Sequence, residues 1–198
     1  MTETSARERA PQGTPEQASP RRAELLDACY GYLLEHGLAG LTLRPLAVAT
    51  GTSPRVLLYL FGSKDALVRD LLARARREQL ALITATIEQE PHAGFEVVVE
   101  RLWQLLSALE QRAMVRLTYE GFLASLRGDP GPWQGFAAES ARDWLELLIR
   151  AQPGVRRPVA QARATYALAL IRGLLLDLLA CDEPDRVTAA ATLTQPLR

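Results

Sequence analysis

The stretch that decides the fold is residues 42–64, TLRPLAVATGTSPRVLLYLFGSK. Thr42 is a good N-cap for a short helix, and Gly51 ends that helix after about two turns. Ser53 and Pro54 then begin a second helix, because proline is favoured directly after an N-cap residue. The stretch therefore predicts two short helices joined by a tight turn.

Longer helices flank this pair on both sides. Apolar residues at spacings of three and four form one stripe on the preceding helix, namely Leu25, Leu26, Cys29, Tyr30, Leu33 and Leu34. Gly37 ends that helix, and Ser63 caps a long helix that runs from Lys64 towards Gln89. One helix packed across two short ones is the helix-turn-helix arrangement, which places the later short helix in the major groove of DNA.

Positive and negative charges are equal in number over the whole chain, but one stretch carries only positive charges. The chain has 23 Lys and Arg against 23 Asp and Glu, which excludes a polybasic tether spread over the whole molecule. Between His36 and Lys64 there is no acidic residue, and Arg44, Arg55 and Lys64 are basic. A surface that approaches phosphates needs this local absence of acid.

Turn signals divide the remainder into helices, so the predicted fold class is all-α with about nine helices. Residues 1–20 are polar and proline-rich, which predicts a disordered N-terminal arm. The helix-turn-helix unit is expected at 21–66 and a larger helical region at 67–198. Expected helices within that larger region are 93–109, 111–127, 134–150, 159–180 and 184–194.

Several classes of site are not supported. Cys29 and Cys181 lie far apart without a Cys or His cluster, so we expect neither a metal site nor a disulfide. The chain has no nucleophile elbow, HExxH or glycine-rich phosphate loop, so we expect no enzyme and no cofactor. The most apolar stretch, 164–180, contains Arg172 and Asp177, which makes it a poor membrane span. A cytoplasmic protein is the expectation.

The stretch from Ala23 to Leu72 resembles the N-terminal domain of TetR-family transcriptional regulators. Its first helix, ELLDACYGYLLEHG, is similar to a family opening of the type ILDAALELFAEHG. The following motifs keep the family's order: Thr42-Leu43-Arg44, Leu46-Ala47, Gly51, Ser53, Leu57, and the Tyr-x-Phe-x-Ser-Lys ending at Tyr59, Phe61, Ser63 and Lys64, with Leu67 after it. The chain departs from the family pattern at Leu58 and Leu60, where tyrosine and histidine are common.

The resemblance implies DNA contacts at Thr42, Arg44, Ser53, Arg55, Val56, Leu58, Tyr59 and Lys64. Arg55 could bond a guanine edge through two N–H groups, and Lys64 could grip a phosphate together with the N–H groups of its helix. Val56 or Leu58 could touch a thymine methyl group. Leu57 and Phe61 are expected to be core residues.

Alternatives stay open for three of these contacts. Thr42 could act as a cap only, Arg44 as a solvated cation, and Tyr59 as a partly buried ring. Arginines at the start of the chain could also enter the minor groove, namely Arg7, Arg9, Arg21 and Arg22.

The resemblance also implies a pocket for a small, largely apolar effector in the 67–198 region, which would be a ligand-binding and dimerisation domain. Candidate pocket residues are Trp103, Met114, Arg116, Tyr119, Glu120, Phe122 and Trp144, with Arg116 and Glu120 orienting a polar ligand group. Core packing is the alternative for each aromatic residue and for Met114.

The helix 159–180 is apolar nearly all round, so it needs cover on two sides. The resemblance implies a homodimer whose interface candidates are Tyr166, Leu170, Gly173, Leu174, Asp177 and Leu178. The implied function is a ligand-responsive repressor that binds a palindromic operator on double-stranded DNA. Two alternatives remain, a helical interaction protein of the same fold with weakened DNA binding and a helical enzyme.

Overall fold

The structure is a computed structural model that describes residues 15–89, 93–128, 130–181 and 183–191. Its described part contains nine α-helices, one 3-10 turn and no strand, which confirms the all-α prediction. The helices are α1 (Pro15–His36), α2 (Leu43–Ala49), α3 (Pro54–Phe61), α4 (Lys64–Gln89), α5 (Phe95–Ser107), α6 (Arg112–Leu126), α7 (Phe136–Arg150), α8 (Arg157–Ala180) and α9 (Pro184–Ala191). The arginines predicted in the arm at positions 7 and 9 lie outside the described residues.

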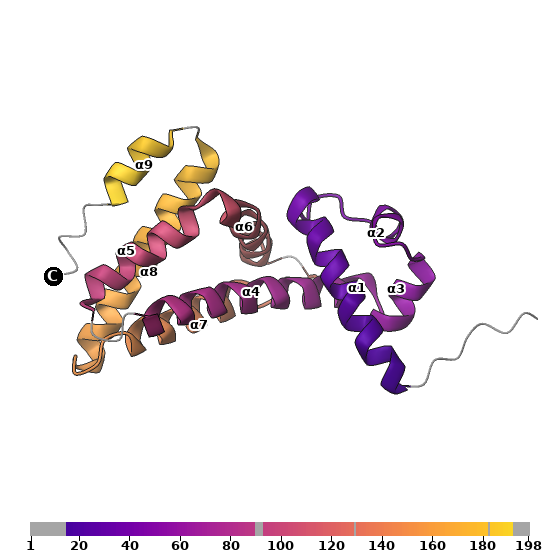
Figure 1. Ribbon diagram of the computed structural model, residues 1–198, viewed down its shortest axis with the longest axis horizontal. Helices are drawn as coiled ribbons and strands as arrows, with labels where there is room; N and C mark the ends of the chain where they lie inside the picture. Colours follow the sequence, from indigo (N-terminus) through magenta and orange to yellow (C-terminus); the bar gives the residue numbers. More distant parts are fainter. Residues whose placement is uncertain (1–14, 90–92, 129, 182, 192–198) are drawn as a thin grey trace, which may run out of the picture.

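Helices α1, α2 and α3 form a head at one end of an elongated molecule (Figure 1). Their inward-facing side chains share a core with the first half of α4, which includes Leu67 and Leu71. Leu117 of α6 and Phe136 of α7 also enter this core. The head is therefore packed against the rest of the chain, and the expected boundary at residue 66 falls in the first turn of α4.

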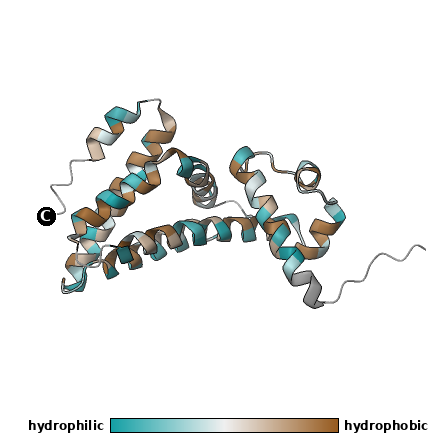
Figure 2. Ribbon diagram, in the orientation of Figure 1, coloured by the Kyte–Doolittle hydropathy of each residue, from teal (hydrophilic) through white to brown (hydrophobic). Residues whose placement is uncertain are grey.

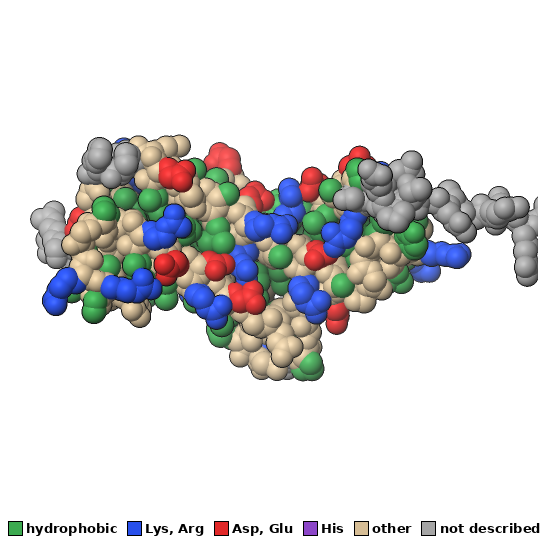
Figure 3. Space-filling model, turned by 90° about the horizontal axis from the view of Figure 1, so that it is seen from below, with side chains coloured by type: hydrophobic (Ala, Val, Ile, Leu, Met, Phe, Trp, Pro, Cys, Tyr) green, Lys and Arg blue, Asp and Glu red, His purple; other side chains and the backbone are tan. Residues whose placement is uncertain are grey.

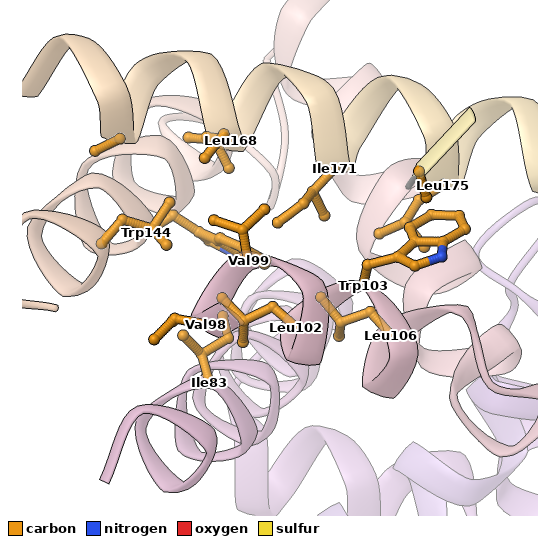
Figure 4. Close-up of a cluster of buried hydrophobic side chains, with 14 of the residues drawn as sticks. Ile83, Val98, Val99, Leu102, Trp103, Leu106, Trp144, Leu168, Ile171 and Leu175 are labelled. Atoms are coloured by element: carbon orange, nitrogen blue, oxygen red, sulfur yellow. The ribbon is translucent and has the colours of Figure 1, made fainter. Parts of the chain in front are cut away.

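Helix α4 is the longest helix and runs from the head along α7 (Figure 1). Helix α8 packs against α7, α5 and α9. Side chains of α4, α5, α7 and α8 meet in a second core, in which Val99 and Leu102 of α5 lie between Ile83 of α4 and Ile171 of α8 (Figure 4). Hydrophobic residues are concentrated on α3 and where the helices of the second core face each other (Figure 2).

The predicted helix limits agree with the structure to within two residues except at the N-terminus, and the predicted end of the last helix at 194 lies outside the described residues. Helix α4 spans Lys64–Gln89 as the Ser63 cap predicted, and the Ser63 hydroxyl accepts a hydrogen bond from the N–H of Ala66 at 3.0 Å. Helix α1 begins at Pro15, so residues 15–20 are helical and not part of an arm. Proline at the first helical position explains this start, because it has no N–H to leave unpaired there.

Candidate nucleic-acid interface and ligand cavity

The turn between α2 and α3 presents one side of α3 to solvent. Leu57 and Phe61 are buried, as predicted, and hold the inner side of α3 in the head core. The N–H of Val56 donates a hydrogen bond to the Ser53 hydroxyl at 3.3 Å, which caps α3 and sets its direction. Tyr59 is 74% exposed, so the partly buried ring considered for it is wrong.

All eight predicted DNA-contact residues are exposed, namely Thr42, Arg44, Ser53, Arg55, Val56, Leu58, Tyr59 and Lys64. Among the described residues, no ion pair occupies Arg44, Arg55 or Lys64. The Thr42 side chain makes no capping hydrogen bond, although its residue is the N-cap of α2. Its hydroxyl group is therefore left to serve an outside acceptor or donor.

Sequence reasoning missed Val48 of α2. This side chain is 76% exposed, and it lies one helical turn after Arg44, so both face the same side of α2. The spacing of four residues between Arg44 and Val48 could have indicated from the sequence that both face the same side. Val48 adds an apolar contact point to a surface that otherwise consists of bases and hydroxyl groups.

Arg22 stabilises the head and is not available for the minor groove. Its guanidinium group forms an ion pair with Asp70 of α4, and its Nε donates to the carbonyl of Leu60 at 3.3 Å. The same group lies 4.9 Å from the centre of the Phe61 ring. Arg22 therefore joins α1, α3 and α4, while Arg21 pairs with Glu24 at 3.1 Å on the surface of α1.

Basic and acidic side chains are mixed elsewhere on the molecule. Figure 3 shows them interleaved over the middle of one face. This mixture agrees with the zero net charge of the chain. The stretch from His36 to Lys64 contains no acidic residue, and neither does 147–176, so charge alone does not distinguish the head.

A small cavity lies between α4, α6, α7 and α8, with a free volume of about 30 Å³. Three of the seven predicted pocket residues line it, namely Tyr119, Phe122 and Trp144. Its other lining residues are Gln79, Thr118, Ser140, Ile171, Arg172 and Leu175. The spacing was an available signal for two of the polar ones, because Gln79 and Ser140 lie four residues from the buried Ile83 and Trp144 on their helices.

Two aromatic side chains in the cavity wall are fixed by hydrogen bonds. The Tyr119 hydroxyl donates a hydrogen bond to the carbonyl of Arg172 at 2.6 Å, and the Trp144 indole N–H donates to Oε1 of Gln79 at 3.0 Å. Burial raises the pKa of Tyr119 to about 12, while the positive charge of Arg172 acts in the opposite direction. The phenol therefore keeps its proton near neutral pH.

Four of the seven predicted pocket residues lie elsewhere. Trp103 and Met114 are buried in the second core, where Figure 4 shows Trp103 at one end of the cluster. Arg116 and Glu120 bind the C-terminal end of α1 instead of a ligand. Arg116 lies three residues before Tyr119 and Glu120 lies one residue after it, and both side chains contact the end of α1.

This contact, which we name the α1 clasp, consists of Arg116 and Glu120 with the end of α1. The Glu120 carboxylate accepts a hydrogen bond from the N–H of Leu38 at 2.5 Å, and Arg116 donates to the carbonyl of Leu34 at 3.1 Å. Gly37 has a φ of +74°, and a Cβ there would lie 2.8 Å from Oε1 of Glu120. The clasp therefore needs glycine at this position.

Helix α8 exposes a stripe of mostly small residues along its outer side. The stripe consists of Ala162, Tyr166, Ala169, Gly173, Leu176 and Ala180, at alternating spacings of four and three. A Cβ at Gly173 would meet nothing within 4 Å, so this side of the helix is open. Such a spacing forms one continuous seam on a helix.

The predicted dimer residues are divided between this stripe and the inside of the chain. Tyr166 and Gly173 are exposed, and Leu170 and Leu174 are half-buried beside the stripe. Asp177 pairs with Arg186 of α9 at 2.9 Å. Leu178 is buried in the second core, so its prediction as an interface residue was wrong. An apolar residue on a helix covered from two sides does not reveal which side it faces.

None of the described helices is long and apolar enough to cross a membrane. Within the described ranges, no cluster of three or more His, Cys, Asp or Glu side chains could hold a metal ion.

Comparisons with known proteins agree with the head geometry. Residues 25–71 match the family model described as bacterial regulatory proteins, tetR family. A Mycobacterium tuberculosis protein described as the HTH-type transcriptional repressor Rv1474c is 26% identical over 195 residues, which cover 93% of this chain and 96% of that protein.

Solved structures share the fold over nearly the whole chain. A TetR-family regulator from Cytophaga hutchinsonii has a TM-score of 0.74 at 13% identity and covers 91% of this chain and 94% of that one. A multidrug binding protein, EbrR, solved with imidazole, has a TM-score of 0.67 at 26% identity and covers 92% of this chain and 95% of that one.

Proposed function

Since the chain belongs to the tetR family of bacterial regulatory proteins, and is a DNA-binding transcriptional regulator, we propose that it is a dimeric repressor released from its operator by a small effector. Regulators of this family are not enzymes, which removes the helical-enzyme alternative. The observation that carries the proposal is the outer side of the head, where Arg44, Arg55 and Lys64 are exposed and no acid intervenes.

The proposed reading of DNA starts from α3. Arg55 bonds a guanine edge, while Val56 and Leu58 touch thymine methyl groups. Lys64 begins α4, so its ammonium group and the free N–H groups of the first turn bind one phosphate together. Phosphate contacts position the head and base contacts supply the sequence preference.

The dimer is proposed to form through the outer stripe of α8, with α9 beside it. Small residues at Ala169 and Gly173 allow two copies of α8 to approach closely, and Tyr166 and Leu176 supply the apolar area. A two-fold axis there gives two copies of α3, as a palindromic site requires.

Release is proposed to use the two helices that connect the cavity with the head. Gln79 lines the cavity fifteen residues after Lys64 on α4, a separation of roughly 22 Å along the helix axis. Helix α6 carries Tyr119 and Phe122 in the cavity wall and the α1 clasp on another side. A ligand that displaces these helices changes the position of the heads, to the extent that it binds one arrangement more tightly.

The test uses fluorescence anisotropy with duplexes from the chain's own upstream region, over a range of salt concentrations. We expect Lys64→Ala to weaken binding to all duplexes and to lower the salt slope by about one unit. Arg142→Ala removes an exposed arginine of α7 and serves as the control. A parent protein that is monomeric and does not bind any duplex at low salt would contradict the proposal and favour the interaction-protein alternative.

A further inference from the structure

The cavity contains hydrogen-bond donors that have no partner among the described residues. The Trp144 indole N–H can only donate, so the oxygen of the Gln79 amide accepts it and the NH₂ group of that amide remains. Within the described residues, neither this NH₂ group nor the Ser140 hydroxyl has a hydrogen-bond partner. Gln79 is 4% exposed and Ser140 is 1% exposed, and both line the cavity, so a molecule held in the cavity can serve as their partner.

The cavity also has a cation without a counter-charge. The guanidinium group of Arg172 lies 4.8 Å from the centre of the Phe122 ring, and no described carboxylate forms an ion pair with it. Burial lowers the pKa of Arg172 from its ordinary value, which records the cost of holding this charge away from water. No Asp or Glu is among the residues that line the cavity.

The size and the walls of the cavity show how it opens. A free volume of about 30 Å³ accommodates one water molecule and no larger ligand. Gln79, Ser140 and Trp144 are buried at its inner side, whereas Phe122 and Arg172 are half-buried and close its outer side. A ligand larger than water needs the Phe122 ring and the Arg172 guanidinium group to separate, which would free that group to face the ligand.

We propose that the effector is an apolar molecule with a single carboxylate, which pairs with Arg172 while its apolar body lies against Phe122 and Trp144. A carboxylate accepts two parallel N–H groups from a guanidinium group and has lone pairs left for the donors of Gln79 and Ser140. A cationic ligand meets the like charge of Arg172 here, and no carboxylate is among the lining residues. This inference rests on the proposed binding of the effector between the C-terminal helices.

The test compares three probes with the same ten-carbon chain and different head groups: decanoate, decanol and decyltrimethylammonium. Binding is measured without DNA, by calorimetry and by quenching of tryptophan fluorescence, below the micelle concentrations of the two ionic probes and below the solubility limit of decanol. We expect decanoate to bind at least about tenfold more tightly than decanol, because the charged pair forms in a site shielded from water. We expect decyltrimethylammonium to bind most weakly.

Substitutions at Arg172 test whether this side chain causes the preference for decanoate. Arg172→Gln should lose at least about tenfold in decanoate affinity and stay within about twofold of the parent for decanol. Arg172→Lys should keep part of the preference, because it retains the charge without the bidentate geometry. Arg142→Gln removes the same charge from an exposed position on α7 and should match the parent. If Arg172→Gln does not fold, the probe series on the parent and Arg172→Lys decide the question.

The outcomes separate this inference from the proposed function. Equal or tighter binding of decanol or decyltrimethylammonium, or no binding of decanoate, overturns the acid preference, and operator binding by the parent then still supports the regulator. Decanoate binding that depends on Arg172 supports the inference even where the operator complex does not respond. In that case the proposed release mechanism fails and the ligand site remains.

Discussion

Glu120→Ala tests whether the α1 clasp couples the head to the effector region. The substitution removes the carboxylate that accepts the Leu38 N–H at 2.5 Å. A hydrogen bond to a charged group contributes about 1.5–3 kcal/mol to stability, and the half-burial of Glu120 places the expected loss near the lower limit, at about 1.5–2 kcal/mol. At about 2–4 °C per kcal/mol for a chain of this size, the expected fall in Tm is about 3–8 °C.

Urea unfolding followed by circular dichroism measures the loss. Glu120→Gln keeps a neutral acceptor, so we expect about half the loss of Glu120→Ala. Glu110→Ala removes an exposed carboxylate from the 3-10 turn two residues before α6 and should stay within about 0.5 kcal/mol of the parent. A loss from Glu120→Ala as small as this control's would refute the clasp. We further expect a smaller ligand-induced change in operator affinity for Glu120→Ala.

Three further predictions address other parts of the molecule. Gly37→Ala should destabilise the chain by about 2 kcal/mol or more in the same urea assay, because alanine disfavours the positive φ and its Cβ displaces the clasp carboxylate. Leu176→Glu should convert the dimer to monomer in light scattering after size exclusion, whereas Leu126→Glu, also at an exposed position, should leave the mass unchanged; equal masses for both variants would contradict the α8 interface. Iodoacetamide at pH 8 should label Cys181 and spare Cys29, because Cys29 is buried and burial raises its pKa to about 11; labelling of both thiols in the folded protein would show that the head opens.

Much of the head could be predicted because its signals are local. The Ser53 cap and Pro54 fixed the start of α3, and the buried pair Leu57 and Phe61 follows from helical spacing. The exposed side of α3 then follows from the same spacing. Only Val48 was overlooked, since an apolar residue in a short helix is ordinarily assigned to the core.

The predictions that were wrong concern residues whose positions depend on contacts between distant segments. The α1 clasp joins residues 82 positions apart, and the spacing of Arg116 and Glu120 on α6 does not reveal what they face. Leu178 lies on a helix that is apolar on every side, so periodicity could not assign its orientation. In the sequence, Arg172 is a charged residue within an apolar stretch, which argues only against a membrane span. Its contact with Phe122 forms when α6 and α8 pack together, so the sequence does not reveal it.

The apolar exposed side of α3 has a consequence for the conditions under which this protein selects its site. Electrolyte weakens the attraction between basic side chains and the DNA backbone, but it leaves contacts between Leu58 or Val56 and thymine methyl groups almost unaffected. On the proposed docking, rising ionic strength removes the protein from arbitrary sequences faster than from its operator. The operator complex would then persist at salt concentrations at which arbitrary sequences are no longer occupied.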